Sequence, residues 1–223
     1  LSEGWSYLPA IPTKTRDGRK VHVGNKSEYM PGPETTYQSY GVPWANVSNT
    51  PFRLYKHWIH EGGIATPLII SWPDHIANEG GMTDEVGHIT YLMATCLEAA
   101  GVSYPDSYEG NDIREMEGKS LIPILEGKSR SGHDHIGWEH HGNRAIRQEE
   151  LKLVYRGNSN WKFEPGTPGQ WELYNMVEDR TEMNNLATTY PEKVKELKKL
   201  YQSWADRTGV INYEKLQKMR KKG

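Results

Sequence analysis

The spacing of hydrophobic positions changes along the chain and predicts two kinds of structure. Residues 65–72 form a largely apolar run, Ala-Thr-Pro-Leu-Ile-Ile-Ser-Trp. A run of this length is typical of a strand that is buried on both faces in a parallel sheet. A helix is predicted to begin near Thr83, because Thr is a good N-cap and acidic residues follow it, and to end before Gly101. We therefore expect a strand and a helix of an α/β domain here.

One side of this predicted helix is apolar and includes the cysteine of the chain. The positions that recur at helical spacing are Val86, Ile89, Met93, Cys96, Leu97 and Ala100. Their placement predicts that Cys96 is a core thiol and not a nucleophile. Because the chain has one cysteine, it has no internal disulfide framework.

The second half of the chain follows a different pattern. Residues 144–147 and 151–156 alternate between apolar and polar positions and predict a hairpin that turns at 148–150. Residues 171–176 can add another strand. A helix is predicted from Pro191 to about Thr208, with proline at its first position. Its apolar face is formed by Val194, Leu197, Leu200, Tyr201 and Trp204. A short antiparallel sheet covered by one helix is the simplest interpretation.

The change of pattern also predicts the domain organisation. Residues 1–129 are interpreted as the C-terminal portion of a large α/β domain, and residues 130–223 as a small α+β subdomain. Prolines and glycines make residues 1–50 look irregular, as expected of a substrate-side loop region or of a piece of a larger domain. Since the chain opens on Leu1, we expect the true N-terminus to lie further upstream.

Charge and composition narrow the function classes. The formal net charge of −2 indicates neither a nucleic acid nor a membrane surface as partner, and no apolar run approaches the length of a membrane span. The basic residues between 215 and 222 are interpreted as a solvated tail. Tyr and Trp (13 and 8) far outnumber Phe (2). These amphipathic aromatics suit a surface that binds sugars or aryl groups, although ordinary packing under long loops gives the same composition.

The first candidate for chemistry is the segment 49–63. It places Arg53, Lys56, His57 and His60 before a glycine pair, Gly62 and Gly63. Cations on a rigid element can bind an oxyanion such as sulfate or phosphate. The glycines suit a tight turn or a close backbone approach. A solvated basic face has the same spacing, so both interpretations stay open.

The second candidate is the histidine-rich segment 132–143. Its four histidines and two carboxylates are residue types that bind metals, but no H-x-x-x-H or CxxC spacing is present. We therefore predict no metal ligand here and assign the segment to packing at a strand edge. The chain also has no P-loop, G-x-G-x-x-G or G-x-S-x-G motif. The residues alone thus offer one candidate anion-binding segment and no complete catalytic apparatus.

Several strings, in order along almost the whole chain, resemble the type I (formylglycine-dependent) sulfatase or arylsulfatase family. They are Trp44 to Lys56, Glu61-Gly-Gly, Pro67 to Pro73, Val86-Gly-His88, Glu117 to Leu121, Gly142 to Arg147, Lys152 to Val154, Trp171 to Tyr174, Asp179 to Glu182 and Asn185-Leu186. The resemblance implies an alkaline-phosphatase-like fold, in which a large α/β domain precedes a small antiparallel sheet with one packed helix. It also implies a sulfuric ester hydrolase that acts on a sulfated small molecule or a sulfated glycan.

The resemblance assigns one site residue directly. Lys56 matches the lysine, five positions before Glu-Gly-Gly, that contacts a sulfate oxygen and the leaving-group side of the site. Arg53, His57 and His60 are weaker candidates for lining the substrate pocket. The formylglycine nucleophile and the calcium ligands of the family are expected upstream of Leu1, so we expect these 223 residues to be inactive alone.

The sequence departs from the family pattern at two positions, and two alternative functions stay open. Tyr91 stands where relatives usually carry Asp, and Ala94 replaces a usual Pro; both are expected to affect packing more than chemistry. A non-catalytic binding module, or a phosphate or phosphonate ester hydrolase of the same superfamily, would share this scaffold. Localisation stays open, although relatives are commonly exported.

Overall fold

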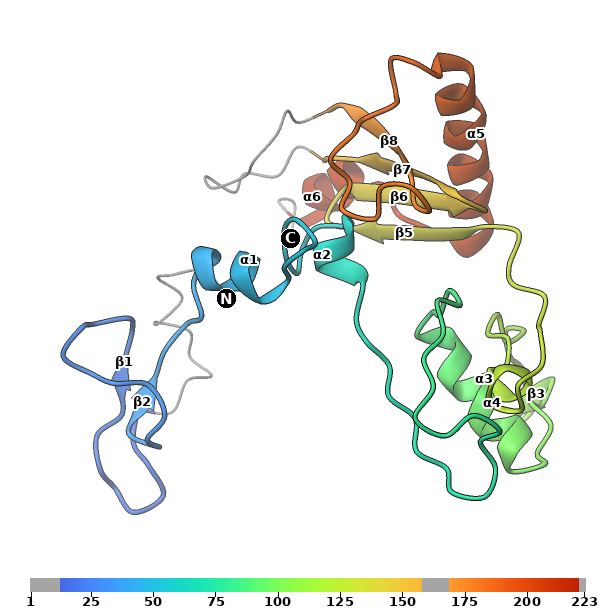
Figure 1. The fold of residues 1–223 in the computed structure, drawn as a ribbon. Helices are drawn as coiled ribbons and strands as arrows, with labels where there is room; N and C mark the ends of the chain where they lie inside the picture. The colour runs from blue at the N-terminus through green and yellow to red at the C-terminus, as the bar shows by residue number, and fades with distance from the viewer. Residues whose placement is uncertain (1–12, 158–168, 221–223) are drawn as a thin grey trace. The chain divides into compact units, whose positions relative to one another are not determined.

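The computed structural model describes residues 13–157 and 169–220 (Figure 1). Contacts divide the chain into two compact units: one holds residues up to Ala65 and those from Ile136 on, and the other holds Thr66–His135. The elements are β1 (His22–Val23), β2 (Thr36–Tyr37), α1 (Val42–Ser48), α2 (Glu61–Ile64), α3 (Thr90–Ala99), β3 (Ser107–Tyr108), β4 (Asn111–Asp112), α4 (Ile122–Leu125), β5 (Ile136–His140), β6 (Asn143–Gln148), β7 (Leu151–Tyr155), β8 (Trp171–Asn175), α5 (Pro191–Thr208) and α6 (Tyr213–Arg220).

A four-stranded antiparallel sheet in the order β5-β6-β7-β8 is the centre of the first unit. The predicted hairpin is confirmed as β6 and β7, in which Gln148 pairs with Leu151 across a two-residue turn. The predicted strand at 171–176 is confirmed as β8. β5 pairs with the other edge of β6. It lies in the histidine-rich segment, for which the sequence predicted packing at a strand edge.

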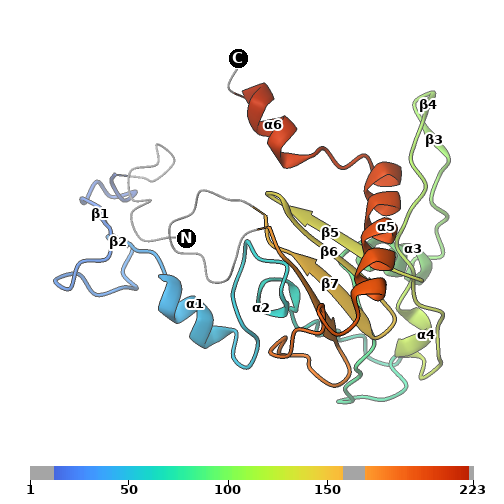
Figure 2. The same ribbon diagram turned by 90° about the horizontal axis from the view of Figure 1, so that it is seen from above.

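The helix α5 covers one face of this sheet, as the sequence predicted (Figure 2). It begins with Pro191 in its first turn and ends before Gly209, whose φ of 76° is the left-handed C′ conformation. Alternate strand residues point toward it, since side chains along a strand face opposite sides in turn. The buried core on this face consists of Ile146, Leu153, Leu173, Leu197, Tyr201 and Ala205.

A substitution at Leu197 tests whether this core is packed as described. Leu197→Ala is expected to lower the free energy of unfolding by about 2–5 kcal/mol, because the fully buried leucine would leave a cavity. Denaturant unfolding of the protein that carries the chain measures this change. The control Lys199→Ala, at an exposed position of the same helix, should stay within about 0.5 kcal/mol. Equal effects of the two substitutions would contradict the assigned packing.

The opposite face of the sheet is also covered. Ala145, Val154 and Tyr174 point to this side and pack with Ile59. Ile64, at the end of α2, packs against the same cluster. The segment 53–64 that holds the predicted anion-binding residues, which we call the Lys56 loop, is therefore mounted on the sheet face away from α5 (Figure 2).

The second unit corrects the expectation for residues 65–72. They form no strand, and the side chains of Leu68 and Ile69 are 54% and 91% exposed. A strand needs neighbours for its backbone hydrogen bonds, and no strand in the described part of the chain pairs with this run. The prediction of a buried strand is therefore wrong for this structure.

The start of the predicted helix and the role of its cysteine are corrected as well. The helix α3 begins at Thr90 and not near Thr83, whose hydroxyl accepts a hydrogen bond from the Glu85 amide outside the helix. Its end before Gly101 is confirmed. Cys96 is exposed, so it is no core thiol. The helix buries its other side through Tyr91 and Ala94, so both departures from the family lie at packed positions.

Two further segments differ from expectation. The irregular first fifty residues include the helix α1, and the predicted solvated tail includes the helix α6, whose Lys215 and Lys218 are exposed. None of the helices in the described residues is both long and apolar enough to cross a membrane. The predicted boundary at 129/130 lies near the junction at 135/136, but the residues before 65 group with the C-terminal sheet.

Candidate functional site

The Lys56 loop is folded tightly by its two glycines. A Cβ atom on Gly62 would overlap the carbonyl oxygens of Arg53 and Leu54. One on Gly63 would overlap those of Tyr55 and Trp58. The chain therefore passes against itself at distances that only glycine allows, which confirms the predicted close backbone approach.

A buried ion group fixes this loop to the sheet. We use this name for Lys152 on β7, Glu61 on α2 and Glu182, of which Lys152 and Glu182 are fully buried. The Lys152 Nζ donates to Glu61 Oε1 at 2.7 Å and to Glu182 Oε1 at 2.9 Å. The second carboxylate oxygen of Glu182 accepts the Glu61 amide at 2.8 Å. Charges removed from water are tolerated when they are paired and hydrogen-bonded in this way.

A second polar contact lies at Glu172 on β8. The ring Nε2 of His60, which is buried, lies 2.8 Å from Glu172 Oε2, and the Tyr174 hydroxyl donates to the same oxygen at 2.8 Å. An Arg53 guanidinium nitrogen lies 3.9 Å from it and another donates to the Glu182 carbonyl at 2.9 Å. Burial raises the pKa of Glu172, but His60, Tyr174 and Arg53 outweigh this effect and hold it below its ordinary value.

The four predicted site residues thus separate into two pairs. Arg53 and His60 are brought together by Glu172 and hold the loop on the sheet. Lys56 is exposed, and its ammonium makes no hydrogen bond or ion pair within the described residues. His57 is half-buried and lies beside histidines of another segment.

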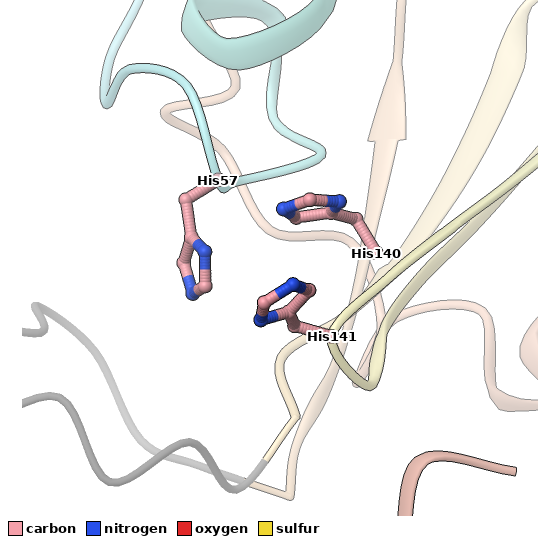
Figure 3. A group of neighbouring side chains, drawn as sticks. All are labelled: His57, His140 and His141. Carbon is pink, nitrogen blue, oxygen red and sulfur yellow. The ribbon is translucent and has the colours of Figure 1, made fainter. Parts of the chain in front are cut away.

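Three imidazoles meet at the end of the β5–β6 hairpin. The ring centroid of His57 lies 5.3 Å from those of both His140 and His141, which stack on each other at 4.4 Å. Each ring offers one nitrogen that could bind a metal, and these three nitrogens all lie within 4.8 Å of one another. Figure 3 shows the three rings turned toward a common space. We call these residues the histidine cluster.

Two rings of the histidine cluster, those of His57 and His140, favour the neutral form. Burial, followed by the charges that His140 and His141 would carry, lowers the pKa of His57 to about 4. Burial and His141 likewise lower the pKa of His140. Near neutral pH the His57 ring is therefore uncharged and keeps a nitrogen lone pair.

Comparisons with known proteins identify the family. The sequence model of the family described as "N-sulphoglucosamine sulphohydrolase, C-terminal" matches residues 52–206, more than half of the chain. The chain belongs to the sulfatase family, as a C-terminal portion. Its matched segment includes the whole Lys56 loop, the sheet and nearly all of α5.

Two sequence relatives agree with this assignment, and a solved structure resembles part of the chain. An uncharacterized sulfatase of Schizosaccharomyces pombe is 33% identical over 92% of this chain and 36% of its own length. An N-acetylglucosamine-6-O-sulfatase of Bacteroides thetaiotaomicron is 28% identical over 65% of this chain and 25% of its own length. A solved structure in complex with its substrate D-glucosamine-2-N,6-O-disulfate is 26% identical, with a TM-score of 0.37, and covers 54% of this chain and 24% of that one. The chain spans about a quarter to a third of the length of these relatives.

Calcium, which the sulfatase family implies, does not fit the histidine cluster. Ca²⁺ takes oxygen ligands from carboxylates and carbonyls. Within the part of the chain that the structure describes, the metal-competent group of three or more side chains consists of imidazoles alone. These three side chains therefore do not suit Ca²⁺.

Sequence reasoning missed the partners that hold the Lys56 loop. Lys152, Glu182 and Glu172 lie far from it in the sequence and carried no local signal. His140 and His141 were considered only with their sequence neighbours, so the third imidazole, His57, was not connected to them.

Proposed function

We propose that this chain is the C-terminal part of a sulfatase that hydrolyses sulfate esters, and that Lys56 contacts the sulfate group. The observation that carries the proposal is the exposed ammonium of Lys56 on a loop whose backbone is fixed. It stands five residues before Glu61, in the matched segment of the family.

The chemistry of Lys56 follows from this placement. A sulfate group shifts charge among its oxygens as the ester bond breaks, and a cation held in place stabilises that charge without reorganising. The two glycines pack against carbonyls on both sides of Lys56, and the buried ion group anchors the loop at Glu61, so both supply rigidity. His57 is proposed to line the same side. For Arg53 and His60 we propose positioning roles, since Glu172 holds both.

The remaining apparatus is proposed to lie outside these 223 residues. A formylglycine hydrate would supply the nucleophile, and a calcium ion would neutralise sulfate oxygens. Without them the chain is expected to be inactive alone. The whole protein is proposed to have an alkaline-phosphatase-like fold, with residues 1–129 completing its large α/β domain and residues 130–223 forming its small subdomain.

A sulfated sugar is the proposed substrate class, with a small sulfated molecule as a wider possibility. The description of the matched family names an N-sulphoglucosamine sulphohydrolase, and one relative is named an N-acetylglucosamine-6-O-sulfatase. Both names refer to sulfated amino sugars.

Paired substrates test the proposed function. The whole protein that contains this chain should release the phenol from an aryl sulfate and sulfate from a sulfated glucosamine, and should act far more weakly on the matching aryl phosphate. Preference for the phosphate would favour a phosphate or phosphonate ester hydrolase. No hydrolysis of any of the three by protein that carries formylglycine would favour a non-catalytic module.

A further inference from the structure

The histidine cluster has the chemistry of a transition-metal site. Imidazole is a ligand for Zn²⁺, Cu²⁺ and Ni²⁺ but a poor one for Ca²⁺ or Mg²⁺. Three histidines with one position left open is an established zinc arrangement in proteins. Here the side chains of His140 and His141 are exposed, so solvent can reach them and supply the remaining ligand.

The backbone around the histidine cluster is fixed before any metal arrives. Two of its members have left-handed backbone, with φ of 95° at His57 and 53° at His141. For His141 the reason is local: it forms a two-residue turn with Gly142 between the paired residues His140 and Asn143. For His57 the conformation is held by the tight packing of the Lys56 loop.

Hydrogen bonds connect the two segments that supply the rings. The buried Asn143 side chain donates to the His57 carbonyl at 3.1 Å and accepts from the Gly157 amide at 3.0 Å. The Glu139 carboxylate accepts the Gly142 amide at 2.7 Å and closes the turn. These contacts limit the cost of ordering the ligands when a metal binds.

We propose that His57, His140 and His141 bind one divalent transition metal, Zn²⁺ or its spectroscopic substitute Co²⁺. The ion would tie the Lys56 loop to the β5–β6 hairpin and would place positive charge one residue from Lys56. This inference does not depend on sulfatase activity, because the ligands and their geometry all lie in described residues of this chain.

Titration with Co²⁺ tests the proposal directly. The whole protein is titrated, and the visible absorption of Co²⁺ is recorded, because a tetrahedral imidazole site gives an intense band while any Ca²⁺ present is silent. Saturation at one Co²⁺ per chain, reversed by added Zn²⁺, is expected. Zn²⁺ should also raise the thermal midpoint, since a ligand that binds only the folded state stabilises it.

Substitutions test whether the Co²⁺ absorption band comes from the histidine cluster. His141→Asn keeps a residue that tolerates the left-handed turn, and His140→Thr suits the end of a strand. Each should weaken binding by at least about 100-fold, because it removes a direct ligand. The matched control His75→Asn changes an exposed histidine of the second unit and should bind as wild type does.

Three outcomes would overturn the proposal. One is a wild-type protein without a saturable Co²⁺ band, which would make the cluster an aromatic stack only. Another is a band that persists unchanged in both variants while circular dichroism shows that they are folded. The third is a band that His75→Asn removes equally. If one variant fails to fold, the other still decides, since the two alter different positions of the hairpin.

Discussion

Lys152→Met is expected to lower the free energy of unfolding by about 3–5 kcal/mol, because it leaves buried carboxylates without their cation. Lys152 is fully buried, and its ammonium contacts both Glu61 and Glu182. Water cannot replace the lost charge where the side chains are this deeply covered. The midpoint of denaturant unfolding, measured near neutral pH, gives the change.

An exposed pair of the same length is the control. Lys195 and Glu192 on α5 lie 2.7 Å apart, as Lys152 and Glu61 do, but their side chains are 67% and 81% exposed. Lys195→Met should therefore change stability by no more than about 0.5 kcal/mol. Adding Glu182→Gln to Lys152→Met should recover part of the loss, because it removes an uncompensated charge. Equal losses at both lysines would contradict the role of the buried ion group.

The elements that the sequence predicted correctly are those whose cover is encoded nearby. The hairpin of β6 and β7, the strand β8 and the helix α5 bury one another, so their periodicities matched their actual surroundings. The Pro191 start and the Gly209 end of α5 were also readable, because both depend on local backbone chemistry.

Elsewhere the sequence contains an apolar pattern, but the burial that the pattern predicted does not occur. The apolar run at 65–72 indicates burial, yet Ile69 is exposed because the described residues supply no neighbouring strand. Periodicity alone also chose the wrong face of α3, where Tyr91 is buried and Cys96 is exposed. Burial depends on what lies opposite, and a single sequence does not contain that information.

The candidate site was predicted only in part, because the partners of its loop lie far away in the sequence. Residue types and the glycine pair singled out the Lys56 loop, and the close approach of Gly62 and Gly63 followed from chemistry. The partners of the loop did not follow, because Lys152 and Glu182 reach it only through the register of the sheet and the turn after β8. The histidine cluster escaped notice on the same grounds, since β5 and the Lys56 loop meet only in three dimensions.

Lys56→Ala in the whole protein is expected to lower the turnover of an aryl sulfate by about 10²–10³-fold, the usual loss when one donor to a developing oxyanion is removed. This expectation rests on the proposed function. Steady-state kinetics on formylglycine-containing protein measures it, and the fall should appear in kcat and in kcat/KM, because the contact strengthens in the transition state.

The same variant should leave the fold intact, and this separates chemistry from structure. Lys56 is exposed and makes no hydrogen bond or ion pair within the described residues, so its removal should change stability by no more than about 0.5 kcal/mol. The control Lys26→Ala, at another exposed lysine of the same unit, should keep wild-type turnover. Full turnover by Lys56→Ala would remove the lysine from the site, whereas lost turnover with lost stability would assign it to the scaffold. A deep loss of turnover at unchanged stability is the pattern that a sulfate-binding cation requires, and it is the reverse of the pattern expected for Lys152→Met.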